Sequence, residues 1–288
     1  MVRQSCVILA GAGILRDGVV NDLREVVTRT NIGVFNSWAA KGLFRWDSPA
    51  HFGTVGLQRD DFVRAQLADA TEVIVVGCDE HEVPRQLLTD LGVAWRDIAT
   101  GDLRTFTHVG HDDMPERPAV YAELAAVCGP LYDDDSVPLN PARAARDLSL
   151  WLPDDGFATA DANICGFWLG RTFPTRHLGS VQLPTAPVAG FAATNALRAS
   201  GIGQTAVVVA PALDGATEQV IEAARRLGQS FIVELWTSVG PQLSSDDRVQ
   251  QLTAAWEKGG VQVVEVGVNF AALSRLVDVC GPPRVWGL

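Results

Sequence analysis

The sequence predicts an α/β protein made of two doubly wound, mainly parallel-sheet domains of the Rossmann-like kind. Short β-branched runs alternate with amphipathic stretches along the whole chain, which is typical of βαβ units and a parallel sheet. The 288 residues suit two domains of ordinary size. The segment 132–138 is charged, contains proline and lacks hydrophobic periodicity, as a linker would. We therefore expect domains at 1–134 and 135–288.

The first half predicts a βα alternation from its first residues. The apolar run 5–10 ends in the glycine turn Gly11-Ala12-Gly13 and indicates a buried strand. Apolar residues at helical spacing predict the next helix at 19–30. The remaining expected strands lie at 31–36, 71–77 and 93–98, and the remaining helices at 60–70, 84–92 and 118–128.

The second half begins with Asn140-Pro141, an N-cap residue followed by proline at the first helical position, and predicts a helix that ends at Trp151. Its later strands and helices alternate again. The expected strands are 156–160, 205–210, 230–235 and 261–266, and the expected helices are 191–200, 217–227, 246–258 and 270–279.

Composition excludes two classes of partner. A formal charge of −11 and a pI near 4.8 argue against nucleic acid, whose binders need basic residues to replace counterions. No apolar run approaches the roughly 20 residues of a membrane helix. The five scattered cysteines form no C-x-x-C pair and favour free thiols in a reducing compartment. We expect a cytoplasmic protein.

The first half carries four local patterns in a fixed order. They are the strand with Gly11-Ala12-Gly13, the segment Phe35–Gly42 with its Lys41-Gly42 pair, the segment His51–Gly56, and the segment Leu67–Gly77. Together they resemble the central domain of thiamine-diphosphate-dependent enzymes of the acetolactate synthase type. Some members of that family hold FAD or an adenine nucleotide in this domain, so the resemblance makes Gly11 and Gly13 candidate nucleotide-binding residues.

The second half contains Leu139-Asn140-Pro141 with its helix, the segment Gly190–Ala196 and the expected strands at 207–209 and 230–235. Together these segments resemble the family's C-terminal domain, which holds the diphosphate. Family members end two strands in Gly-Asp-Gly and in an Asn, because Mg²⁺ needs oxygen ligands to bind the diphosphate. Here those places read Ala210-Pro211-Ala212 and Trp236-Thr237-Ser238. Asp214-Gly215 lies beyond the first strand and is the remaining candidate for cofactor contact. We expect neither thiamine diphosphate nor Mg²⁺ to bind this chain alone.

The resemblance implies one leading function and two alternatives. Because 288 residues leave no room for the family's pyrimidine-binding domain, we expect a non-catalytic accessory or interaction subunit, and we name no catalytic residue. The first alternative is one subunit of a two-chain lyase or carboligase acting on 2-oxo acids or 2-hydroxyacyl-CoA. The second is a nucleotide or CoA-ester binding module. Either a homo-oligomer or a partner chain carrying the missing domain is expected.

Three further candidates come from residue types alone. Arg171, Arg176 and His177 surround an expected loop and could bind an anion. The groups Cys78/Asp79/His81 and His108/His111/Asp112 contain metal-ligand types, but their surroundings favour exposed polar loops, so no metal is expected. Cys165 has no histidine near it in sequence, which favours buried packing over a nucleophile.

Overall fold

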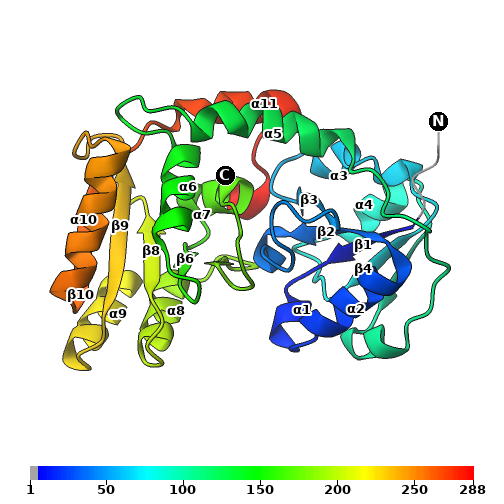
Figure 1. Ribbon diagram of the computed structural model, residues 1–288, viewed down its shortest axis with the longest axis horizontal. Coiled ribbons are helices and arrows are strands. Elements are labelled where there is room, and N and C mark those ends of the chain that lie inside the picture. Colours follow the sequence, from blue (N-terminus) through cyan, green and yellow to red (C-terminus); the bar gives the residue numbers. More distant parts are fainter. Residues whose placement is uncertain (1–5) are drawn as a thin grey trace.

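The computed structural model, which describes residues 6–288, has two five-stranded sheets side by side (Figure 1). The strand orders are β3-β2-β1-β4-β5 and β10-β9-β8-β6-β7, and every pair within them is parallel. The strands are β1 Val7–Ala10, β2 Gly33–Ser37, β3 His51–Val55, β4 Val73–Val76, β5 Trp95–Ile98, β6 Phe157–Thr159, β7 Val181–Gln182, β8 Ala206–Ala210, β9 Phe231–Thr237 and β10 Val261–Gly267. Two doubly wound α/β domains were predicted, and this fold confirms them.

Helices cover both faces of the first sheet. The apolar stripe of α2, with Leu23 and Val26, packs on one face, while Phe62 of α3 and Leu88 of α4 pack on the other. The helices are α1 Gly13–Arg16, α2 Val20–Thr30, α3 Asp61–Arg64 and α4 Arg85–Asp90, with 3-10 turns η1 Trp38–Ala40, η2 Leu67–Asp69 and η3 Thr100–Thr105.

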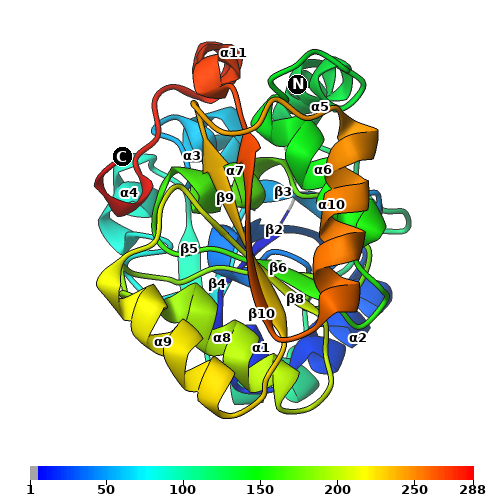
Figure 2. The same ribbon diagram turned by 90° about the vertical axis from the view of Figure 1, so that its left-hand side faces the viewer.

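The second sheet is covered in the same way (Figure 2). Small residues of α8, including Ala192 and Ala196, pack on one face together with α9, while α6, α7 and α10 lie on the other. The helices are α6 Pro141–Trp151, α7 Ile164–Thr172, α8 Phe191–Ser200, α9 Gly215–Arg226, α10 Ser245–Lys258 and α11 Leu273–Cys280, with 3-10 turns η4 Phe270–Ala272 and η5 Val285–Gly287.

Helix α5, Ala119–Tyr132, runs between the two domains (Figure 1). It contacts α6 and α11 of the second domain. The second domain's core also takes in Trp38 and Leu57 of the first domain. The boundary expected at 134/135 falls just after α5. The two domains therefore share an apolar interface, and helix α5 covers it.

The structure corrects three local expectations. The helix expected at 60–70 is broken into α3 and η2 because Gln66 adopts a left-handed backbone conformation, φ 56°. Strand β3 was not predicted, since Gly53, at φ +136°, interrupts its alternation. Helix α7 was also missed: residues 165–172 are all buried, so this helix has no polar face to reveal its period.

Two remarks complete the chain. Ser5, part of the first predicted strand, lies outside the described residues. Within residues 6–288, each helix is too short or too polar to cross a bilayer.

Candidate functional site

The first glycine turn is closed by hydrogen bonds within the chain. The amides of Gly11 and Gly13 donate to carbonyls at the end of β4, at 2.9 and 2.7 Å. A Cβ on Gly11 would lie 2.4 Å from the Cα of Cys78, so glycine is required for the close approach of two backbones. The turn's geometry is thus explained without a ligand. Gly11 and Gly13 as nucleotide-binding residues stay a prediction.

The remaining backbone amide of this turn, that of Ala12, donates to a buried carboxylate. Glu82 accepts the Ala12 N–H at 2.9 Å and the Asp79 N–H at 3.0 Å, and it also accepts the Ser37 hydroxyl. Burial raises the pKa of Glu82, and these three hydrogen bonds oppose the rise. The side chain therefore fills the position in which a phosphate would accept backbone donors.

The second domain repeats this arrangement at two helix N-termini. Asp161, two residues beyond β6, accepts the Ala192 N–H of α8 at 2.8 Å. Asp214 caps α9 by accepting the Thr217 N–H at 2.7 Å. Burial raises the pKa of Asp161, and the nearby Asp214 raises it further against the backbone donors of α8. Two carboxylates therefore hold the donors that a diphosphate would need.

At the end of β9, Trp236 and Thr237 provide no carboxylate or amide oxygen for a metal. Trp236 is fully buried and donates its indole N–H to Glu234 at 2.8 Å. Glu234 in turn accepts two hydrogen bonds of 2.6 Å from the buried Arg248. On β8 the corresponding residues are Ala210 and Pro211. Thiamine diphosphate with Mg²⁺ does not fit the residues present.

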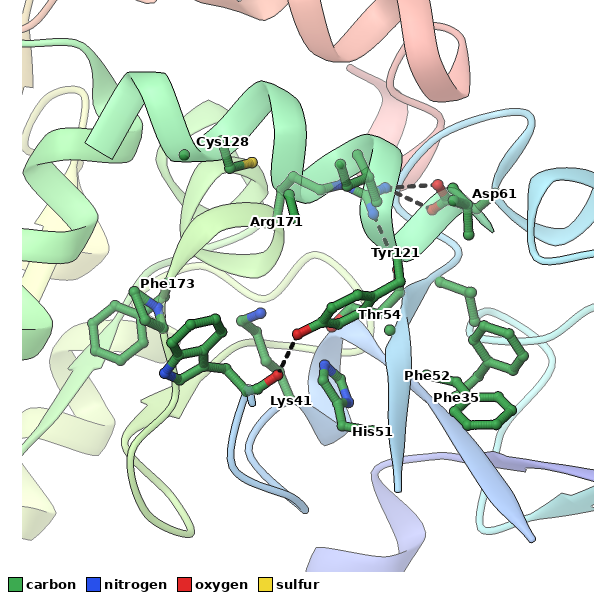
Figure 3. Close-up of a pocket in the computed structure, with 18 of the residues that line it drawn as sticks. Phe35, Lys41, His51, Phe52, Thr54, Asp61, Tyr121, Cys128, Arg171 and Phe173 are labelled. Atoms are coloured by element: carbon green, nitrogen blue, oxygen red, sulfur yellow. Dashed lines mark hydrogen bonds and ion pairs between the residues drawn. The ribbon is translucent and has the colours of Figure 1, made fainter. Parts of the chain in front are cut away.

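A cavity of about 340 Å³ lies between the two domains (Figure 3). Strand β3, helix α5 and the end of α7 form its walls. Trp46 and Ala125 line it and are also exposed, which places its mouth between them. Most of the lining is apolar and aromatic, contributed by Phe35, Trp46, Phe52, Val55, Val120, Tyr121, Leu124, Tyr132, Phe173 and Pro174.

Arg171 links the two domains at one wall of this cavity. Its guanidinium donates to both carboxylate oxygens of Asp61, at 2.7 and 2.8 Å, and to the Thr54 carbonyl at 3.0 Å. Both side chains of the ion pair are 2% exposed. The Nε–H of Arg171 is buried without a hydrogen-bond partner. The arginine is thus fixed in place while one donor stays unused.

Lys41 extends into the cavity from the first domain (Figure 3). The residue is 7% exposed, and its ammonium has no hydrogen-bond partner within residues 6–288. Burial lowers the pKa of Lys41 to about 7, and the charge of Arg171 adds to the effect. The Cys128 thiol opposes it, and burial raises the pKa of that thiol to about 11.

His51, at the start of β3, supplies the third unpaired polar group. Its Nδ1 is buried and has no hydrogen-bond partner among residues 6–288. Burial lowers the pKa of His51 to about 3, with further contributions from the charges of Lys41 and Arg117. The ring is therefore neutral at physiological pH.

The sequence candidates separate in space. Arg171 lines the cavity, whereas Arg176 is exposed and pairs with Asp154 at 3.3 Å. His177 is half-buried, and its Nδ1 lies 3.2 Å from the backbone carbonyl oxygen of the adjacent residue, Leu178. Neither of the latter two lines the cavity, so the three do not form one site. Asp214 and Gly215 start α9, where the carboxylate acts as a cap.

His108 lies beside residues other than those considered with it. Its Nε2 is 3.4 Å from Glu72, and together with the Cys6 thiol the ligand atoms lie within 4.8 Å. Burial raises the pKa of Cys6 to about 12, whereas a metal requires the thiolate. Cys165 is fully buried, and burial raises its pKa, which is consistent with packing.

A family model described as "Thiamine pyrophosphate enzyme, central domain" matches residues 3–93. Residues 3–93 are thus similar to the central domain of these enzymes. That match confirms the resemblance of the first half, including the Lys41-Gly42 and His51–Gly56 segments that line or flank the cavity. No curated protein shows significant sequence similarity to the chain.

Two solved structures of thiamine-dependent enzymes share the fold of both domains. A putative thiamin diphosphate-dependent enzyme from Mycobacterium smegmatis is 16% identical, with a TM-score of 0.67 over 92% of this chain. Benzoylformate decarboxylase from Polynucleobacter necessarius is 13% identical, with a TM-score of 0.68 over 93% of this chain. The chain spans 61% and 62% of their respective lengths.

Sequence reasoning did not identify Lys41 and His51 as residues that line the cavity. One signal was present: Lys41 is one of only two lysines in the chain, and it follows the apolar segment Trp38-Ala-Ala. A lysine in such surroundings is commonly placed at the surface with its stem on apolar groups. Only the packing of α5 over β3 reveals that this amine is enclosed.

Proposed function

We propose that this thiamine-pyrophosphate-enzyme homologue does not hold the Mg²⁺-diphosphate group in its C-terminal domain and acts as a non-catalytic accessory or binding protein. The position of Asp161 carries this proposal. A carboxylate that accepts hydrogen bonds from the start of α8 repels a diphosphate and uses the donors the diphosphate would need. Asp214 adds a second negative charge beside it.

Calorimetric titration of the full chain with thiamine diphosphate and Mg²⁺ tests this function. We expect no saturable heat at ligand concentrations up to about 1 mM, which corresponds to binding weaker than about −4 kcal/mol. Micromolar binding would overturn the proposal. The same titration with Mg²⁺ omitted distinguishes cofactor binding from nonspecific association with the nucleotide-like anion.

Replacing the carboxylate sharpens this test. Asp161→Ser keeps a short side chain that can cap α8 but removes the charge from its N-terminus. We expect this variant to bind inorganic pyrophosphate more tightly than the wild-type chain does. Asp155→Ser, at an exposed position nearby in sequence, is the matched control and should leave pyrophosphate binding unchanged. Equal affinities for all three chains would remove Asp161 from the explanation.

An accessory role implies a partner, and we infer that the chain self-associates or binds a second chain, because members of this family are commonly oligomers. Light scattering of the purified chain distinguishes a homo-oligomer from a monomer. Copurification of a second protein, with turnover of a 2-oxo acid only when both are present, would favour the two-chain enzyme instead. The five free cysteines support a reducing compartment such as the cytoplasm.

A further inference from the structure

The interdomain cavity combines an apolar interior with polar atoms that nothing in the described chain satisfies. Buried polar groups in proteins are normally hydrogen-bonded, so unpaired ones require an explanation. Here the Nε–H of Arg171 and the Nδ1 of His51 are both unpaired, and both residues line the same cavity. The Lys41 ammonium also lacks a hydrogen-bond partner within residues 6–288.

The groups around Lys41 leave its amine available for reaction. Arg171 of α7 is held as a cation by Asp61, and His51 of β3 is neutral. The phenols of Tyr121 and Tyr132 donate to the carbonyls of Trp46 and Thr172, at 2.8 and 2.6 Å.

These surroundings favour the uncharged form of the amine. Burial removes water that would stabilise the ammonium, and a fixed cation at Arg171 repels it. Both conditions are known to make a lysine nucleophilic toward carbonyl compounds. The Cys128 thiol acts in the opposite direction, but its effect on the pKa of Lys41 is smaller than the effects of burial and of Arg171.

The cavity's size and lining define the compound that fits. Its 340 Å³ lies at the lower end of ligand pockets and exceeds the roughly 150 Å³ that accommodate benzene. Aromatic side chains line it from both domains, including Phe35, Phe52 and Phe173. An apolar or aromatic body of one ring with short substituents would bury its surface here.

We propose that Lys41 forms a reversible imine with a small aldehyde or ketone that has an aromatic or aliphatic body and binds in this cavity. The amine nitrogen of Lys41 attacks the carbonyl carbon, and the oxygen takes up a proton to give a carbinolamine. The C–O bond then breaks, and both hydrogens of the amine leave with the oxygen as water. Hydrolysis reverses these steps, so no oxidant or reductant takes part. His51 and Arg171, whose Nδ1 and Nε–H have no partner within residues 6–288, line the same cavity and would bind the oxygen that develops.

Reductive trapping tests the imine. The full chain is incubated at about pH 7.5 with benzaldehyde and sodium cyanoborohydride, which converts an imine into a stable benzylamine, and the labelled lysine is located by peptide mass mapping. Lys258 is the only other lysine and is exposed at the end of α10, so it is an internal reference. We expect labelling of Lys41 to exceed that of Lys258 about tenfold or more.

Two variants and one condition serve as controls. Lys41→Arg keeps a cation but cannot form the imine, and it should lose the fast label. Lys258→Arg should retain it. In urea the cavity is lost, and the two lysines of the wild-type chain should then label equally.

The pH dependence and a second probe complete the test. Labelling of Lys41 should rise with a midpoint near its pKa of about 7. Glyoxylate, a polar aldehyde of smaller size, should label Lys41 more slowly than benzaldehyde does. Native labelling of Lys41 no faster than that of Lys258, or equally fast in urea, would overturn the proposal, whatever the result for thiamine diphosphate.

Discussion

Among the described residues, the buried polar groups at the strand ends are hydrogen-bonded, whereas several in the interdomain cavity have no partner. At the strand ends, the chain's own carboxylates, Glu82, Asp161 and Asp214, accept hydrogen bonds from backbone amides. In the cavity, Lys41 and His51 have polar atoms without partners. Satisfied groups stabilise the fold, whereas unsatisfied ones reduce its stability unless a ligand completes them. This contrast supports the proposal that a ligand binds at the domain interface rather than at the strand ends.

The largest change in the free energy of unfolding is expected at the buried ion pair between Glu234 and Arg248. Arg248→Met leaves Glu234 as an unpaired carboxylate in the second domain's core and should lower the free energy of unfolding by about 3–5 kcal/mol. Urea denaturation followed by circular dichroism measures it. Arg176→Met, at an exposed arginine, should change the value by no more than about 0.5 kcal/mol. Similar results for both variants would contradict the assignment of Glu234 and Arg248 as a structural pair.

Lys41→Met should instead raise the free energy of unfolding. The pKa of Lys41 is about 7 in the folded chain and near 10.5 when unfolded, so between these pH values the unfolded chain binds more protons. The wild-type chain therefore gains stability as the pH rises through this window, and the penalty is fully present below it. At pH 7 the variant should be more stable by roughly 2–4 kcal/mol.

The difference between these two chains should shrink toward pH 10. Parallel denaturation curves at several pH values measure it, and Lys258→Met controls for the loss of a lysine in general. A variant that is less stable than the wild type at pH 7 would mean that the Lys41 ammonium has a partner, and the comparison between closed and open polar sites would fail.

Glu82→Gln alters a side chain whose hydrogen bonds are satisfied but keeps a polar group of the same shape. The amide oxygen of glutamine can still accept two of the three hydrogen bonds, but its NH₂ group would face the Asp79 N–H. We expect a loss of about 1–3 kcal/mol in the free energy of unfolding. Glu222→Gln, on the exposed side of α9, should have little effect. An unchanged stability of the Glu82 variant would show that the first glycine turn does not depend on this carboxylate.

The smallest effect is expected at the N-terminus of α9. Asp214→Ala removes a cap and should cost about 1 kcal/mol, measured by thermal or urea denaturation. Asp214→Asn keeps the acceptor and should be close to neutral. If both variants were equally destabilised, the charge at Asp214, rather than its hydrogen bond, would stabilise this end of the sheet.

The sequence predicted the fold more fully than the site for a physical reason. Apolar β-branched runs and the cap at Asn140 are local signals, and most strands and helices formed where those signals lie. Arg171 was selected as a ligand candidate by its chemical type alone. That it pairs with Asp61, 110 residues away, and that Lys41 is enclosed are results of packing between domains. Such long-range contacts have no local signature.

Helix α5 gives the cavity a mechanical property. Its residues roof the cavity above β3, while the same helix is packed against α6 and α11 of the second domain. Any rotation of one domain against the other must therefore change the width of the space around Lys41. A compound bound there would hold the two domains at a fixed separation. Binding should therefore reduce the motion of one domain relative to the other.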